Sequence, residues 1–242
     1  MKIFKLWTAV LIVVTTMTTL NAETKRYEIK SGIIEYTTSG SMNMMGVTSK
    51  TTGTGKMLFK EWGNVELHKE EEITTVMGRE ERQQELTKID NGKLYTVDFD
   101  ERVIITYSPE MLKNSEYNSI QKGKEMMKQM GGKKIGEEKV LGYKCEVWEL
   151  MQSKIWLHKG ILLKQEANIM GTKYTTVATS VKFNVSISDK EFKLPDFPLK
   201  TMDQMMQEKM QGPGGDSAGE MPQMTPEQMQ QMQEMMKSFS GN

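Results

Sequence analysis

Two stretches of the chain alternate apolar and polar side chains at the period of a β-strand. β-Branched and aromatic residues recur at short spacing from Arg26 to Tyr107, and the pattern resumes from Lys133 to Val185. The predicted strands are residues 26–38, 56–62, 64–76, 81–89, 93–99, 102–107, 133–140, 143–150, 153–159, 161–170 and 173–185. Because little chain separates consecutive strands, we expect an antiparallel meander without crossover helices.

Turn and cap residues divide this pattern. Asn91-Gly92 is typical of a two-residue hairpin turn, because a type I′ turn needs positive φ at both central positions. Between the two strand-rich stretches, Ser108 is a candidate helix N-cap, Pro109 suits the first helical position, and Gly131-Gly132 predicts the helix end. We therefore predict one β-dominated domain over residues 23–199, with a helical insertion at about 109–130.

The first 22 residues have the three-part pattern of a secretory signal peptide. Lys2 and Lys5 form a basic start, residues 6–17 are mostly apolar, and the segment ends on the small residue Ala22. The apolar run is thinned by threonines and is shorter than the ~20 residues of a bilayer span, which favours cleavage after Ala22 over an uncleaved membrane anchor. The predicted product is periplasmic or secreted and soluble, with no transmembrane segment in the mature chain.

Charge and cysteine content narrow the partners of this exported chain. Without residues 1–22, 30 basic residues face 32 acidic ones, and the two signs are interleaved, which argues against nucleic acid as the main partner. A single cysteine excludes an internal disulfide framework. Cys145 shares a predicted strand face with Tyr143 and Val147, so we expect it to be a buried apolar residue and not a reactive thiol.

The last 43 residues, 200–242, form a methionine-rich and glutamine-rich tail that holds ten of the chain's 23 methionines. Its pattern predicts two short helices joined by a flexible linker at 211–224. Methionine stripes on these helices suit an adaptable contact, either a lid over an apolar groove or a surface for a protein partner. A second interpretation is a soft-metal site for copper, because thioethers are favoured ligands of Cu(I), and a third is a disordered tail. The candidate ligands are Met224, Met229, Met232, Met235 and Met236.

The sequence contains no recognisable catalytic motif. The chain has two histidines, His68 and His158, and neither an H-E-x-x-H nor a G-x-S-x-G pattern is present. Residues 53–56, Gly-Thr-Gly-Lys, lack the remaining positions of a phosphate-binding loop. The acidic residues of 98–101 lie beside Arg102 in what we interpret as a solvated hairpin tip. We therefore expect no enzymatic activity and no cofactor.

Residues 134–198 carry the segments GYKCEVWE, KIWLHKGILLKQEANIMG, TTVATSVKFN and ISDKEFKLPDFP. In this order they resemble the closing strands of the lipoprotein-carrier-like proteins, the LolA, LolB and RseB superfamily, and especially its secreted relatives. The resemblance implies a mainly β fold with inserted helices (α+β): an unclosed antiparallel β half-barrel covered by helices. It also implies an apolar cavity suited to acyl chains or apolar peptide segments.

Together these features predict an exported, non-enzymatic binding protein that holds an apolar ligand in the concave face of a half-barrel. The ligand would be a lipid, a lipoprotein's acyl chain or an apolar peptide segment. Trp62, Trp148 and Trp156 are the candidate cavity residues, although each could equally belong to the core. Two alternatives are soft-metal binding through the tail, and an envelope protein-interaction or stress-sensing module.

Overall fold

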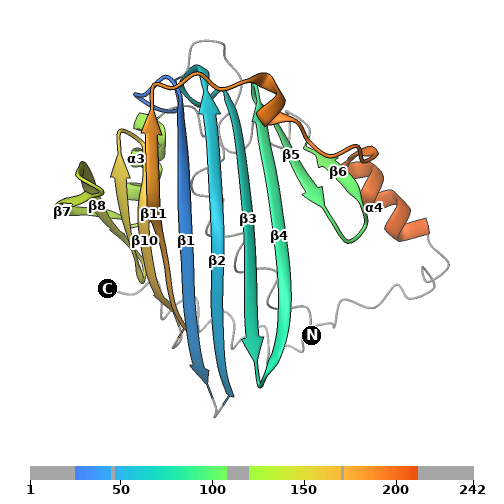
Figure 1. Ribbon diagram of the computed structural model, residues 1–242, viewed down its shortest axis with the longest axis horizontal. Helices are drawn as coiled ribbons and strands as arrows, with labels where there is room; N and C mark the ends of the chain where they lie inside the picture. The colour runs from blue at the N-terminus through green and yellow to red at the C-terminus, as the bar shows by residue number, and fades with distance from the viewer. Residues whose placement is uncertain (1–24, 45–46, 108–119, 170–171, 212–242) are drawn as a thin grey trace. The chain divides into compact units, whose positions relative to one another are not determined.

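The computed structural model describes residues 25–44, 47–107, 120–169 and 172–211. Twelve strands form a single unclosed sheet in the order β12-β6-β5-β4-β3-β2-β1-β11-β10-β9-β8-β7 (Figure 1). The chain divides into a compact unit that ends at Thr201, which holds the sheet, and a second unit that begins at Met202. The mainly β, antiparallel character predicted from the sequence is confirmed.

The first half of the sheet is a meander of six strands. They are β1 (Gly32–Met44), β2 (Val47–Lys60), β3 (Val65–Val76), β4 (Arg79–Asp90), β5 (Lys93–Asp98) and β6 (Val103–Thr106), with the short 3-10 helix η1 (Glu61–Gly63) after β2. The predicted turn at Asn91-Gly92 joins β4 to β5, with φ of 49° and 82°. The expected strand at 26–38 is wrong in its first part, because β1 begins at Gly32.

The second half follows the helix α3 (Ile120–Gln129). Its strands are β7 (Lys133–Val140), β8 (Tyr143–Leu150), β9 (Ser153–His158), β10 (Ile161–Ile169) and β11 (Thr172–Phe183), followed by η2 (Asp189–Phe192) and β12 (Leu199–Thr201). β11 pairs antiparallel with β1, so the first and last long strands join the two meanders. β12, which the sequence pattern does not predict, pairs parallel with β6.

Apolar side chains pack on both faces of the sheet. Phe59 belongs to one buried cluster, with Ile34, Met57, Cys145 and Val147. Its neighbour Leu58 belongs to a second cluster, as expected from alternation along a strand. The second cluster also contains Leu67, Leu86, Val97, Ile104 and Phe192, so the segment around η2 covers that face. The prediction for Cys145 is confirmed: its exposed fraction is 1%, and burial raises the pKa of the thiol.

Helix α3 packs against β8. Met127 forms a buried cluster with Trp148 and Leu150, and the Nζ atom of Lys124 lies 2.8 Å from the Glu146 carboxylate. The helix ends as predicted at Gly131, whose φ is +86°, and the Gly132 amide donates to the Met127 carbonyl at 2.6 Å. The predicted start at Ser108 and Pro109 lies outside the described residues.

The segment before β1 is held at the β2–β3 connection by a buried ion pair. Arg26 Nη1 lies 2.9 Å from a carboxylate oxygen of Glu66 on β3 and donates to the Gly63 carbonyl at 2.9 Å. Tyr27 Oη donates to the same Glu66 oxygen at 2.7 Å. Burial would lower the pKa of Arg26, but the attraction of Glu66 outweighs it and raises that pKa, so the guanidinium stays charged.

The remaining expectations concern the two ends of the chain. Residues 1–22, the predicted signal peptide, and 212–242, the second predicted tail helix and most of the linker, lie outside the described residues. The first predicted tail helix is present as α4 (Met202–Gln211). Within the part of the chain that the structure describes, no helix is long and apolar enough to cross a membrane.

Candidate functional site

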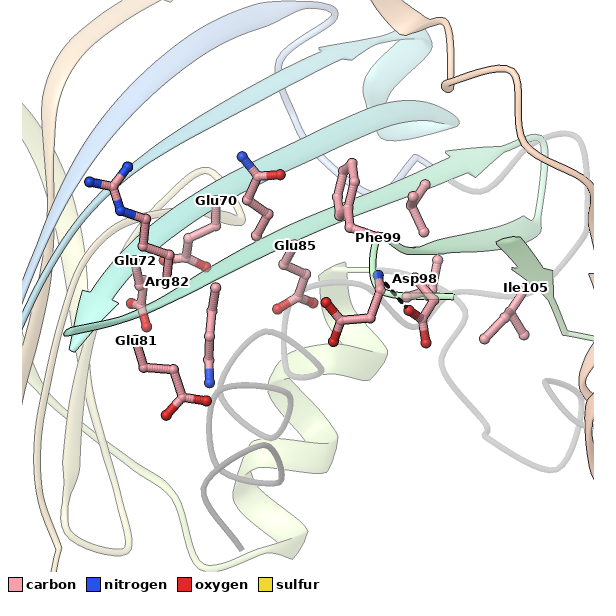
Figure 2. A pocket seen from close by; sticks show the side chains of 13 residues that line it. Glu70, Glu72, Glu81, Arg82, Glu85, Asp98, Phe99 and Ile105 are labelled. Carbon is pink, nitrogen blue, oxygen red and sulfur yellow. Dashed lines mark hydrogen bonds between the residues drawn. The ribbon is translucent and has the colours of Figure 1, made fainter. Parts of the chain in front are cut away.

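The candidate site lies where β5 diverges from β4. β5 pairs with β4 only from Thr87 to Asp90, so the earlier part of β4, Arg79–Leu86, has no partner in β5. Beside that part is a cavity of about 510 Å³, bounded by β3 and β4 on one side and by the β5–β6 hairpin on the other (Figure 2). The local cause is strand length, because β4 has 12 residues and β5 has six.

The described lining of this cavity is acidic, with apolar residues at the hairpin. The lining includes six carboxyl groups and one guanidinium, that of Arg82. The carboxyl groups belong to Glu70, Glu72, Glu81, Glu85, Asp98 and Asp100, and the apolar residues are Val97, Phe99 and Ile105. A ligand with both an apolar part and a cationic or hydrogen-bonding group would satisfy such a lining.

Strand register places the central carboxyl groups together. Glu70 on β3 pairs with Glu85 on β4, and residues two apart on one strand share a face, so Glu72 joins them. Figure 2 shows all three projecting to the same side of the two strands. Ile105 pairs with Thr96, which pairs with Thr87, so Ile105 continues the same register pattern on β6. Val97 and Phe99 contact the second apolar cluster as well.

Burial changes the protonation of this group of carboxyls. Glu70 is 8% exposed, and burial raises its pKa to about 8, with Glu72 and Glu85 adding to the rise because like charges repel. Burial also raises the pKa of Glu72 and of Glu85. At neutral pH the Glu70 carboxyl is therefore mostly protonated, and a protonated carboxyl can donate as well as accept a hydrogen bond.

Hydroxyl groups from β1 and β11 hold the two buried carboxyls. Tyr174 Oη donates to Glu72, and Thr38 Oγ1 donates to Glu70 at 3.4 Å. Gly53 on β2 pairs with Glu72, and a Cβ at Gly53 would lie 2.9 Å from the Glu72 Cγ. The glycine is thus needed for the close approach of the Glu72 side chain, which gives a structural role to a sequence that only superficially resembles a phosphate loop.

The three tryptophans predicted as cavity residues lie elsewhere. Trp148 packs on α3, and its indole Nε1 donates to Glu146 at 3.2 Å. Trp156 belongs to the first buried cluster. Trp156 pairs with Val147, the residue next to Trp148, so the two rings lie on opposite faces. Trp62 is half-buried in η1, with the Lys25 ammonium 4.6 Å from its ring centroid. None of the three lines the cavity beside β4.

The predicted metal ligands Met224, Met229, Met232, Met235 and Met236 lie outside the described residues. In the ranges that the structure does describe, no group of three or more His, Cys, Asp or Glu side chains is arranged to hold a metal ion. The turn acids behave partly as expected: Asp98 accepts from the amides of Asp100 and Glu101 at 3.0 and 2.8 Å, which closes the hairpin tip. Asp98 and Asp100 also line the cavity, which the sequence does not reveal.

Sequence reasoning missed the central carboxyls. Glu70, Glu72 and Glu85 stand in the charge-rich runs of residues 69–72 and 79–85, which look like ordinary solvated strand faces. The sequence does offer one signal, the glycines of β2. A glycine within a strand often marks a position that another part of the chain approaches closely. Which side chain approaches the glycine, however, depends on the strand register, and the sequence does not show that register.

Comparison with other proteins gives a likeness of fold. Neither protein-family models nor curated proteins give a match. Similar solved structures include an uncharacterized conserved protein from Thermus thermophilus, with 6% identity over 69% of this chain and 90% of that one, at a TM-score of 0.38. A putative outer membrane lipoprotein-sorting protein domain from Vibrio parahaemolyticus is 14% identical over 69% and 92%, at a TM-score of 0.29. LprF from Mycobacterium bovis is 8% identical over 68% and 90%, at a TM-score of 0.30.

One of these structures is a lipoprotein-sorting domain, the class of protein that residues 134–198 resemble, and the matches cover about 69% of this chain. At TM-scores of 0.38 and below, they carry no conclusion about what the chain binds. Only the cavity itself indicates what the chain could bind.

Proposed function

We propose that the chain is an exported, non-enzymatic binding protein whose ligand lies in the cavity beside β4. The single observation that carries this proposal is a space of about 510 Å³ with carboxyl groups on β3 and β4 and apolar side chains on the β5–β6 hairpin. The ligand is an amphiphile, such as a lipid or an apolar peptide segment, with its apolar part against Ile105. Its cationic or hydrogen-bonding group faces Glu70 and Glu85.

The position of α3 supports a helix-covered concave face. Residues paired directly across an antiparallel sheet share a face. One such register row runs from the helix-packed tryptophan to the cavity: Trp148, Ile155, Gln165, Thr176, Thr38, Gly53 and Glu72. The helix that packs on Trp148 is therefore on the same face as Glu72, and Figure 2 shows α3 on the side to which the carboxyls project. This is the arrangement expected of a half-barrel with a sheltered binding face.

The proposal predicts a preference for a cationic head group. Uptake of the neutral apolar fluorophore N-phenyl-1-naphthylamine is measured first, and the dye is then displaced by dodecylamine or by dodecanoate, which have equal chain lengths. We expect dodecylamine to displace the dye at a concentration roughly tenfold lower, because a hydrogen bond to a charged group contributes about 1.5–3 kcal/mol. Glu85→Gln is expected to reduce this preference, and Ile105→Ala is expected to weaken uptake of the dye itself.

Glu149→Gln is the matched control, because Glu149 is an exposed glutamate on β8 that does not line the cavity. It should leave both measurements unchanged. A protein that takes up no dye, or that shows equal displacement by the amine and the carboxylate, would contradict the proposal.

A further inference from the structure

Two of the hairpin loops at one end of the sheet are two residues long and begin with methionine, an unusual first residue for such a turn. Met77-Gly78 joins the paired residues Val76 and Arg79, and Met151-Gln152 joins Leu150 and Ser153. The antiparallel register places both loops at the same end: β1 finishes there beside the start of β11, and the amide of Asn168 near the end of β10 donates to the Gln152 carbonyl at 3.0 Å. The β3–β4 turn is visible at the lower end of the long strands in Figure 1.

Both methionines project into solvent. Met77 is 81% exposed and Met151 is 75% exposed, the two highest values among the large hydrophobic residues exposed in the described part of the chain. Their φ angles are +50° and +54°. Positive φ is unfavourable for a bulky side chain, and asparagine or glycine is the usual residue at such a position. These methionines therefore add nothing to the core and occupy positions where another residue would make a better turn.

The sequence has a Met-Gly dipeptide at two further strand connections at this end of the sheet. Met45-Gly46 stands between the paired residues Met44 and Val47, and Met170-Gly171 stands between Ile169 and Thr172; both dipeptides lie outside the described residues. Two-residue loops at the opposite end begin instead with Asn91, Leu141 and Lys159. Only 13 methionines lie outside the tail, so their concentration in these loops is not a consequence of composition.

The spacing of the loops identifies the kind of partner. Four strands lie between the Met77 loop and the Met151 loop, so the loops are about 30 Å apart along a sheet with strands about 4.8 Å apart. Thioethers so widely separated cannot share one metal ion or one pocket. Two single methionine tips at this distance do not form the continuous surface of roughly 800 Å² that each partner buries in a stable protein interface. An extended apolar layer beneath a polar surface can accept both tips, because it requires neither a short distance between them nor a large continuous contact area.

Charge around these loops is nearly balanced. Within four residues of the four dipeptides, the basic residues are Lys50, Arg79, Arg82, Lys154 and Lys173, and the acidic residues are Glu80, Glu81, Glu149 and Glu166. Such a surface has little electrostatic attraction for anionic lipids. Any attachment at this end must therefore come from the apolar side chains.

We propose that this end of the sheet docks on the surface of a lipid bilayer, with the side chains of Met77 and Met151 inserted at the level of the lipid head groups. Methionine is flexible and unbranched, which suits it to packing among mobile lipids. The inference does not depend on the proposed ligand cavity. It gives the protein a defined orientation at a membrane through its hairpin tips.

The test uses residues 23–242, the chain left by the predicted cleavage, in co-flotation with phosphatidylcholine vesicles. We expect the wild type to float with the vesicles and Met77→Asn/Met151→Asn to partition roughly tenfold less, because two apolar side chains are lost from the interface. Asparagine suits positive φ, so the melting temperature of the variant should be equal or higher. The expected attachment persists at high salt, because the flanking charges are balanced.

Leu141→Asn provides the matched control. Leu141 is also the first residue of a two-residue loop, with φ of +49° and an exposed fraction of 51%, but it lies at the opposite end of the sheet. It should leave flotation unchanged. The proposal is overturned if the wild type does not float, if the double variant floats as well as the wild type, or if Leu141→Asn reduces flotation equally. Self-association that disappears in the double variant without any vesicle binding would assign these tips to contact between copies of the chain instead.

Discussion

Replacing Arg26 with alanine is expected to lower the free energy of unfolding by about 3–5 kcal/mol. The side chains of Arg26 and Glu66 are each only 4% exposed, and their charged atoms lie 2.9 Å apart. Removing the guanidinium leaves the Glu66 carboxylate buried without its counter-charge, although the Tyr27 hydroxyl still donates to it. A buried charge without its counter-charge is costly, because the interior cannot replace the lost hydration. Guanidinium chloride denaturation monitored by tryptophan fluorescence measures the change.

A double-mutant cycle separates the lost ion pair from lost packing. Arg26→Ala/Glu66→Ala removes both charges, so its cost should fall well short of the sum of the two single costs. Lys69→Ala serves as a surface control: Lys69 pairs with Glu71 at 2.7 Å, but the two side chains are 51% and 46% exposed, and we expect a far smaller effect. If the single costs simply add in the double variant, Arg26 and Glu66 do not stabilise each other as an ion pair.

The strands with clear apolar alternation could be predicted from sequence. β3, β5, β8 and β9 agree with their predicted bounds to within one residue at each end. The turn at Asn91-Gly92 follows from local chemistry, because its two residues adopt the positive φ that a type I′ turn requires. Local patterns succeed where the burial of one face and the turn geometry are both encoded within a few neighbouring residues.

Other parts of the fold depend on distant partners. The second half of β1 and the first half of β2, residues 39–44 and 47–55, are rich in serine, threonine and glycine and show no apolar alternation. They are strands because they extend pairs that begin in the apolar core around Ile34 and Phe59. β12 has three residues and is defined only by its parallel pairing with β6. Neither feature has a signal within its own sequence.

The candidate site shows the same limit. The sequence offered tryptophans as candidate cavity residues, each of which could equally belong to the core, and Trp148 and Trp156 lie in buried clusters. The two buried carboxyls of the lining, Glu70 and Glu72, are placed by the register of β3 against β2 and β4, and the divergence of β5 opens the space beside them. A glutamate in a charged run gives no indication of burial until that register is known.

Glu70→Gln is expected to stabilise the protein strongly at alkaline pH. The pKa of Glu70 is about 8 in the folded protein, above its ordinary value of 4.5, so the folded state binds a proton that the unfolded state releases between these values. The free energy of unfolding of the wild type should therefore fall as pH rises through this window, by up to about 1.4 kcal/mol per unit. Glutamine needs no proton to remain neutral. The variant should be more stable than the wild type by roughly 3–5 kcal/mol at pH 9, with little difference near pH 4.

Urea denaturation at a series of pH values between 4 and 9 tests this expectation. Some slope should remain in Glu70→Gln, because burial also raises the pKa of Glu72 and Glu85. Glu71→Gln is the matched control on the adjacent residue: Glu71 is exposed, and its hydrogen bond to Lys69 lowers its pKa, so its replacement should give no alkaline gain. Parallel stability curves for the wild type and Glu70→Gln would mean that the Glu70 carboxyl is hydrated in the folded protein. The cavity would then lack the protonated donor proposed to face its ligand.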